Sequence, residues 1–173
     1  QASRQPGSTF KPIVYALGVR SHQLTPSTVM IDAPAVYDQW MPQNYEPWRH
    51  EGPVPLRIAL AKSINVVAVR AIEMVGPQEV VRFAQQLGIE SELDPQASLA
   101  LGASEVRPIE MVNAYATFAT GGRWQAPRFI TRVIAPNGDE VPLPARAAAR
   151  DVLTPAEAYV VTSMLESVVE EGT

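Results

Sequence analysis

The chain has 173 residues, of which 46% are hydrophobic and 18% are charged, and its formal net charge at pH 7 is −4. This composition is typical of one globular domain or a large piece of one, and the acidic balance argues against nucleic acid as a partner. No apolar run reaches the length that a membrane span needs, and the absence of cysteine excludes disulfides and thiol chemistry. Because His22 and His50 lie far apart with no cysteines near them, we interpret them as ordinary loop histidines and expect no zinc site. We also expect no cofactor.

The first half of the chain alternates between helical and proline-rich patterns. Apolar residues at helical spacing predict a helix that begins at Ser8. Residues 21–55 contain six prolines with tyrosine and tryptophan among them, which predicts a long ordered loop. Helical patterns return at 55–63 and at 66–76, and the second of these ends at a glycine, a residue type common after helix C-termini.

The second half continues with segments that begin at proline and end at glycine. Residues 77–88 and 108–121 both follow this pattern, which predicts two helices. In residues 127–143, β-branched residues flank a Pro-Asn-Gly turn, which predicts a β-hairpin. A capping box from Thr154 to Glu157 opens a final amphipathic helix. We therefore predict a mostly α chain with about five helices and one small β-hairpin.

The segment RQPGSTFKP holds one of only two lysines in the chain, Lys11, three residues after Ser8 at a helix start. Residues three apart on a helix face each other, so Lys11 could take the proton of the Ser8 hydroxyl. It can do so only if burial or a nearby positive charge lowers its pKa toward neutrality. The free N–H groups of the helix start would also stabilise the oxyanion formed when Ser8 attacks a carbonyl. The alternative is that Ser8 is an ordinary N-cap.

A second polar pair, Ser63 and Asn65 in AKSIN, lies at the junction of two predicted helices. A short loop there could direct both side chains into a cleft shared with Ser8. Ser63 could then relay a proton between Lys11 and a leaving amine, while Asn65 holds a substrate amide. The alternative is that the pair merely caps the next helix.

Three long strings carry a resemblance to a known family: RQPGSTFKP, GPVPLRIALAKSINVVAVR and LALGASEVRPIEMVNAYATFATGG. Together they resemble the transpeptidase domain of class A, bifunctional penicillin-binding proteins, and the similarity extends over residues 1–173. The resemblance implies that Ser8 is the acylated serine and Lys11 its general base. It also implies that Ser63 assists proton transfer and that Asn65 contacts the substrate. The third motif of the family, K-T-G, is absent.

What the resemblance implies is a peptidoglycan D,D-transpeptidase that uses an acyl-serine intermediate. Ser8 would attack the penultimate D-Ala carbonyl of a stem peptide, release D-Ala and pass the acyl group to an amine of a neighbouring strand. β-Lactams would block Ser8. Alternative functions are a D,D-carboxypeptidase or β-lactamase of the same superfamily, a non-catalytic β-lactam-binding sensor domain, or a purely structural helical module.

The resemblance also implies the context of the chain. Its parent would be membrane-anchored, with an upstream glycosyltransferase domain, at the extracytoplasmic face of the cytoplasmic membrane in the bacterial cell envelope (the periplasm). We interpret residues 1–173 as the helical part of an α+β domain with the serine β-lactamase/transpeptidase-like fold, lacking flanking sheet strands at both ends. Such a piece is expected to be largely inactive without the K-T-G strand. It is also expected to self-associate through uncovered apolar residues such as Val66, Val67 and Val69.

Overall fold

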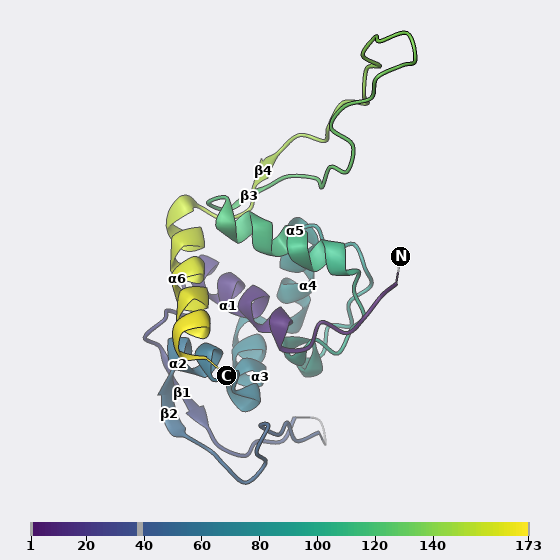
Figure 1. The fold of residues 1–173 in the computed structure, drawn as a ribbon. Coiled ribbons are helices and arrows are strands. Elements are labelled where there is room, and N and C mark those ends of the chain that lie inside the picture. The colour runs from purple at the N-terminus through teal and green to yellow at the C-terminus, as the bar shows by residue number, and fades with distance from the viewer. Residues whose placement is uncertain (1, 38–39, 173) are drawn as a thin grey trace.

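The computed structural model describes residues 2–37 and 40–172, and helices form its body (Figure 1). The predicted mostly α class is confirmed. The helical elements of the described residues are the 3₁₀ turn η1 (Gly7–Phe10), α1 (Lys11–Arg20), α2 (Leu56–Ala61), α3 (Asn65–Val75), α4 (Pro77–Gln86), the 3₁₀ turn η2 (Ala97–Leu101), α5 (Pro108–Ala119) and α6 (Pro155–Glu171).

Helix α1 lies at the centre of the helical body (Figure 1). Eight of its ten residues are buried, because α3, α4 and α6 all pack around it. Its sequence is apolar on every side, which is the pattern of a helix enclosed by its neighbours. Lys11 is the first residue of this helix, so the central position of α1 places a lysine inside the protein.

The proline-rich segment 21–55 contains two strands where the sequence predicted only loop. Strand β1 (Val29–Asp32) pairs antiparallel with β2 (Gly52–Pro55). The prediction missed this pairing because proline weakens any strand pattern, yet each strand of a two-stranded ribbon has an edge that needs no N–H donor. The pairing leads the chain directly into α2, and the loop between the strands reaches the start of α3.

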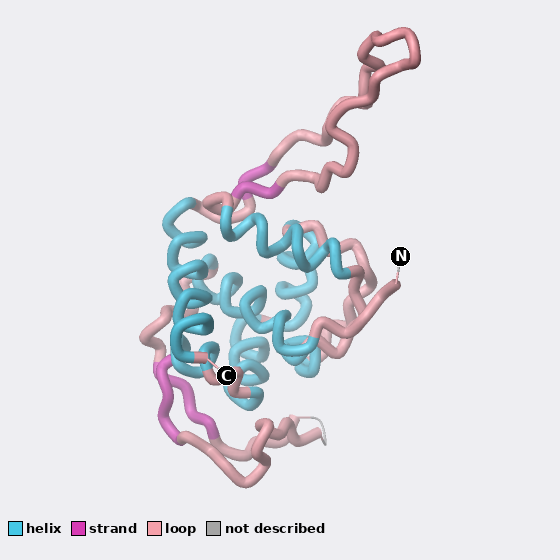
Figure 2. Tube along the Cα trace, viewed as in Figure 1, coloured by secondary structure: helices cyan, strands magenta, loops and turns pink. Residues whose placement is uncertain are grey.

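The hairpin predicted over residues 127–143 is confirmed only in part. Gly138 N–H donates to Ala135 O at 2.9 Å, and a single bridge pairs Ile134 with Glu140. Figure 2 shows the rest of this projecting segment as loop, joined to the body by the short strands described next. With no apolar layer to pack against, the turn forms but the pairing does not extend. The strands at the base are β3 (Arg123–Trp124) and β4 (Arg150–Asp151), which pair antiparallel.

The capping box predicted for the last helix is confirmed. Thr154 Oγ1 accepts a hydrogen bond from Glu157 N–H at 3.2 Å, and the Glu157 carboxylate accepts one from Thr154 N–H at 2.8 Å. Helix α6 then packs on α1, α2 and α5. No helix within residues 2–37 and 40–172 is both long enough and apolar enough to cross a membrane.

The expectation of an uncovered apolar face around the second motif is wrong for the residues named. Val66, Val67 and Val69 are each 0% exposed, because α3 packs against α1, α4 and η2 within the chain itself. Exposed apolar side chains do occur on α6, where Tyr159 and Val169 are 73% and 87% exposed.

Candidate active site

The side chain of Lys11 is completely buried, and its ammonium group donates three hydrogen bonds. The acceptors are Ser63 O at 2.6 Å, Ser63 Oγ at 2.9 Å and Asn65 Oδ1 at 2.6 Å. All three are neutral oxygens. Burial lowers the pKa of Lys11 from 10.5 to about 8, because the charged form loses its hydration inside the protein. Part of the Lys11 population is therefore in the neutral amine form near neutral pH.

The ion pairs of the described residues distinguish the two lysines of the chain. Among the described residues, Lys11 takes part in none of them, whereas Lys62 pairs with Glu51 at 3.3 Å. A carboxylate beside Lys11 would favour the ammonium form and raise its pKa. Because the three acceptors are neutral, the effect of burial prevails over the hydrogen bonds that the ammonium donates, and the pKa of Lys11 falls to about 8.

Ser63 lies in the turn between α2 and α3 and has a left-handed backbone with a φ of 52°. This conformation costs a residue with a side chain about 1–3 kcal/mol, and such strain gathers at functional sites. The turn directs both the carbonyl and the hydroxyl of Ser63 at Lys11. The strained turn therefore supplies two of the three acceptors of the lysine.

Asn65 is the first residue of α3, and its side-chain amide is held on both sides. Its Oδ1 accepts from Lys11, while its Nδ2 donates to Gln43 O at 2.8 Å. The structure thus joins Lys11, Ser63 and Asn65 by direct hydrogen bonds. We call these three residues the lysine site.

Ser8 lies in η1, one turn before Lys11, and its side chain is exposed. The backbone N–H of Lys11 donates to Ser8 O, which places both residues on the same turn. In the part of the chain that the structure describes, the partners of Lys11 Nζ are Ser63 and Asn65, and the Ser8 hydroxyl is not among them. Ser8 is therefore close to the lysine site because it lies on the same turn as Lys11. No side-chain hydrogen bond between the two is found among the described residues.

The turn that carries Ser8 is held by the segment that follows η2. Arg4 and Val106 exchange two backbone hydrogen bonds, at 3.0 and 2.9 Å. Gly102 packs directly on the turn, and a Cβ at this position would overlap Gly7 O. Glycine is the residue that permits so close an approach of two backbones. The string LALGASEV therefore contributes to the placement of Ser8.

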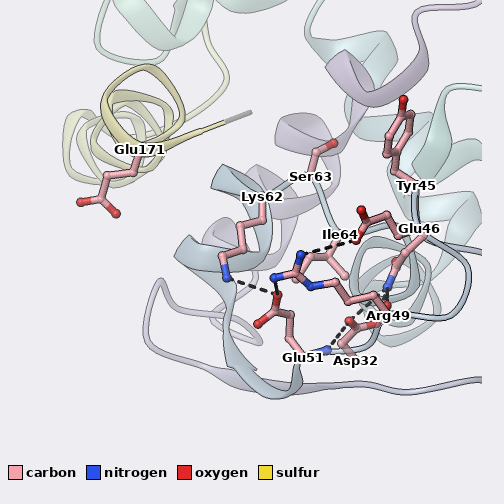
Figure 3. Close-up of a pocket in the computed structure, with 10 residues that line it drawn as sticks. Asp32, Tyr45, Glu46, Arg49, Glu51, Lys62, Ser63, Ile64 and Glu171 are labelled. Carbon is pink, nitrogen blue, oxygen red and sulfur yellow. Dashed lines mark hydrogen bonds and ion pairs between the residues drawn. The ribbon is translucent and has the colours of Figure 1, made fainter.

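Figure 3 shows a cavity of about 400 Å³ beside Ser63, which is bordered by charged side chains. Arg49 and Lys62 both pair with Glu51, at 3.5 and 3.3 Å. In this view the Ser63 hydroxyl points away from that ion cluster (Figure 3). The Ser63 hydroxyl, which accepts a hydrogen bond from Lys11 Nζ, is therefore directed away from the ion cluster.

Two polar residues near the lysine site, Asp32 and Asn44, were not predicted from the sequence. Asp32 ends β1 and is 1% exposed, and it accepts two hydrogen bonds from Asn44 Nδ2. Burial alone would raise the pKa of Asp32, but hydrogen bonds from Glu51 N–H, Asn44 and His50 hold it below its ordinary value. No local pattern marks either residue, because their partners are distant in the sequence.

Comparison with known proteins identifies the family of the chain. The family described as penicillin binding protein transpeptidase domain matches residues 1–173. The chain is 37% identical to penicillin-binding protein 1A of Aquifex aeolicus over 180 residues, which cover 100% of this chain and 24% of that protein. It thus spans about a quarter of the length of that curated relative.

Solved structures of penicillin-binding proteins share the fold. Penicillin-binding protein 1A from Haemophilus influenzae aligns with a TM-score of 0.89 and 27% identity, over 100% of this chain and 31% of that one. The PonA1 protein from Mycobacterium tuberculosis in complex with penicillin V aligns with a TM-score of 0.84 and 26% identity, over 95% of this chain and 47% of that one. The expected fold is confirmed, and the chain belongs to the penicillin-binding protein transpeptidase domain family.

Proposed function

We propose that this chain is the helical part of a peptidoglycan D,D-transpeptidase domain, with Ser8 as the acylated nucleophile and Lys11 as its general base. The observation that carries the proposal is the buried lysine, with its pKa lowered to about 8 among neutral acceptors. A base needs a pKa near the working pH and a position close to the proton that it accepts. Membership of the family supports the reaction class.

In the acylation step, the neutral amine of Lys11 accepts the proton of the Ser8 hydroxyl. Ser8 Oγ forms a bond to the carbonyl carbon of the penultimate D-Ala, and the carbonyl oxygen becomes an oxyanion. The C–N bond to the terminal D-Ala then breaks. The Ser63 hydroxyl, 2.9 Å from Lys11 Nζ, passes the proton to the departing nitrogen, so D-Ala leaves as a free amino acid and Ser8 holds an acyl ester.

In the transfer step, an amine of a neighbouring stem peptide attacks the ester carbon. Its proton moves to Lys11 and on to Ser8 Oγ as the ester C–O bond breaks, and the new amide is the cross-link. Asn65 Nδ2 uses one N–H on Gln43 O, and a side-chain amide has a second N–H to offer a substrate carbonyl. A β-lactam opens its ring C–N bond in the first step, but its nitrogen stays tethered and Ser8 remains blocked.

The proposal extends to the wider protein and to the isolated chain. The partners would be peptidoglycan stem peptides and β-lactams, and the parent would be anchored in the cytoplasmic membrane with a glycosyltransferase domain upstream. The isolated chain would be barely acylated, because its sequence has no K-T-G triplet to complete the oxyanion site. It would also self-associate, and the exposed Tyr159 and Val169 of α6 support this expectation.

Labelled penicillin tests the assignment of the nucleophile in a full-length protein that carries this sequence. We expect one covalent adduct, located on Ser8 by mass spectrometry and lost in Ser8→Ala. An adduct on Ser63, or labelling that survives Ser8→Ala, would overturn the assignment. The isolated chain provides a second sample, in which light scattering and the same label measure self-association and residual acylation.

A stem peptide supplied together with an acceptor amine tests the reaction class. The proposal predicts release of D-Ala with formation of the amide-linked product. Release of D-Ala with hydrolysis alone would indicate a carboxypeptidase, and an acylated protein that never turns over would indicate a sensor.

A further inference from the structure

Asn44, in the loop between β1 and β2, caps a helix that begins 21 residues later in the chain. Its Oδ1 accepts hydrogen bonds from the backbone N–H groups of Asn65 at 3.0 Å and Val66 at 3.2 Å. These groups open α3 and have no partner within the helix itself. The residue at the N-cap position, Ile64, makes no side-chain capping bond. Asn44 supplies the cap that Ile64 cannot.

The orientation of the Asn44 amide is fixed by Asp32. Asn44 Nδ2 donates to both carboxylate oxygens of Asp32, at 2.9 and 3.0 Å. Asp32 is 1% exposed and is itself held by Glu51 N–H at 2.9 Å. An ionised carboxylate only accepts hydrogen bonds, so it requires the NH₂ group of Asn44 on its side. The amide oxygen must then face α3.

Consecutive loop residues hold both the backbone and the side chain of Asn65. Asn44 binds its backbone N–H, and Gln43 O accepts from its Nδ2 at 2.8 Å. Asn65 Oδ1 is thereby turned toward Lys11 Nζ, 2.6 Å away. A chain of hydrogen bonds therefore runs from Asp32 through Asn44 and Asn65 to the lysine.

We propose that Asn44 is a positioning residue for acylation, which acts through Asn65 to fix the amine of Lys11, and that Asp32 fixes Asn44 in turn. This inference rests on the proposed role of Lys11 as the base. Without Asn44, the first turn of α3 loses its cap and Asn65 can move away from the lysine. A displacement of about 1 Å in catalytic geometry can cost about a hundredfold in rate.

The test compares Asn44→Ala with Thr154→Ala in the full-length protein. Each variant removes a side chain that caps a helix of the same body, but Thr154 caps α6 and bonds to Glu157. We expect both variants to lose stability. In Asn44→Ala the first-order rate of Ser8 acylation by penicillin should fall about tenfold to a hundredfold, with a smaller change in the dissociation constant of unreacted penicillin. In Thr154→Ala both constants should equal those of the wild type.

A further pair of variants separates positioning from folding. Asn44→Asp keeps an oxygen for α3 but places a second carboxylate against Asp32, so acylation should slow. The exchange variant Asp32→Asn with Asn44→Asp restores one amide and one carboxylate at the contact, and it should recover most of the lost rate. If Asn44→Ala does not fold, these two variants decide the matter. Acylation at the wild-type rate in every folded Asn44 variant would overturn the inference.

Hydrogen exchange at the start of α3 gives a readout that does not depend on acylation. In Asn44→Ala, the backbone amides of Asn65 and Val66 should exchange at least about tenfold faster than in the wild type. Unchanged exchange would overturn the inference even if acylation slowed. A different outcome would refute the proposed function and not the positioning role. In that outcome, the α3 amides are protected from exchange only when Asn44 is present, but the wild-type protein is never acylated at Ser8.

Discussion

Lys11 and Glu110 are both charged residues inside the helical body, with 0% and 4% of their surface exposed. Glu110, in the first turn of α5, accepts from Ser91 Oγ at 2.6 Å and from Arg107 Nε at 2.8 Å. The negative charge of Glu110 is therefore paired with the positive charge of Arg107. Among the described residues, the hydrogen-bond acceptors of Lys11 are three neutral oxygens, at similar distances.

The two environments shift the two pKa values with opposite consequences for charge. Burial alone would raise the pKa of Glu110, but hydrogen bonds from Ser91 and Arg107 hold it below the ordinary value and keep the carboxylate ionised. Burial lowers the pKa of Lys11 to about 8 and favours the neutral amine. A counter-ion stabilises the charged form of a buried group, whereas a buried group without a counter-ion loses its charge more readily. Glu110 is therefore suited to stabilising the fold, and Lys11 is suited to proton transfer.

The largest effect is expected from Lys11→Arg. Arginine keeps the positive charge but does not release its proton in proteins, so acylation of Ser8 should slow by about 10²–10⁴. The matched control is Lys62→Arg, the same change at a lysine whose side chain is 44% exposed and paired with Glu51. Acylation kinetics of both variants, with folding checked by circular dichroism, measure the difference. A near-normal rate in Lys11→Arg would mean that Lys11 contributes only a charge at the helix start.

A smaller effect, on stability alone, is expected from Glu110→Gln. The change removes the charge that Arg107 and the backbone N–H groups of Glu90 and Ser91 bind, and it should cost about 1–3 kcal/mol in the free energy of unfolding. Urea denaturation measures this loss. The rate of acylation of the folded protein should not change. A fall of tenfold or more in that rate would contradict the view that Glu110 affects stability alone while Lys11 acts in acylation.

Local signals in the sequence were sufficient for most of the helices. The capping box at Thr154 and the glycine that ends α3 both act within one turn of chain, and both are found where predicted. The spacing of Ser8 and Lys11 likewise places them on one turn. These features need only residues close in sequence, so a single sequence shows them.

The remaining features depend on residues distant in the sequence. The hydrogen bonds of Asn44 to Asp32 and Asn65 join three segments, and no periodic pattern links those segments. The left-handed backbone of Ser63 could not be predicted either, because glycine is the residue type that usually marks this conformation in a sequence. The burial of Val67 was missed for a similar reason, since the elements that cover α3 are η2, α1 and α4.

The claim that burial prepares Lys11 to act as a base is tested most directly by the pH dependence of acylation. The pKa of Lys11 is lowered from 10.5 to about 8, so the neutral amine forms as the pH rises through about 8. The measurement is the second-order rate constant for acylation of Ser8 in the full-length protein, with a β-lactam whose own charge is constant from about pH 6 to about pH 10, because this constant reports ionisations of the free enzyme. We expect a rate that rises about tenfold per pH unit and levels off above a midpoint near 8. A rate that stays flat across this range, or a midpoint near the ordinary lysine value of 10.5, would contradict it.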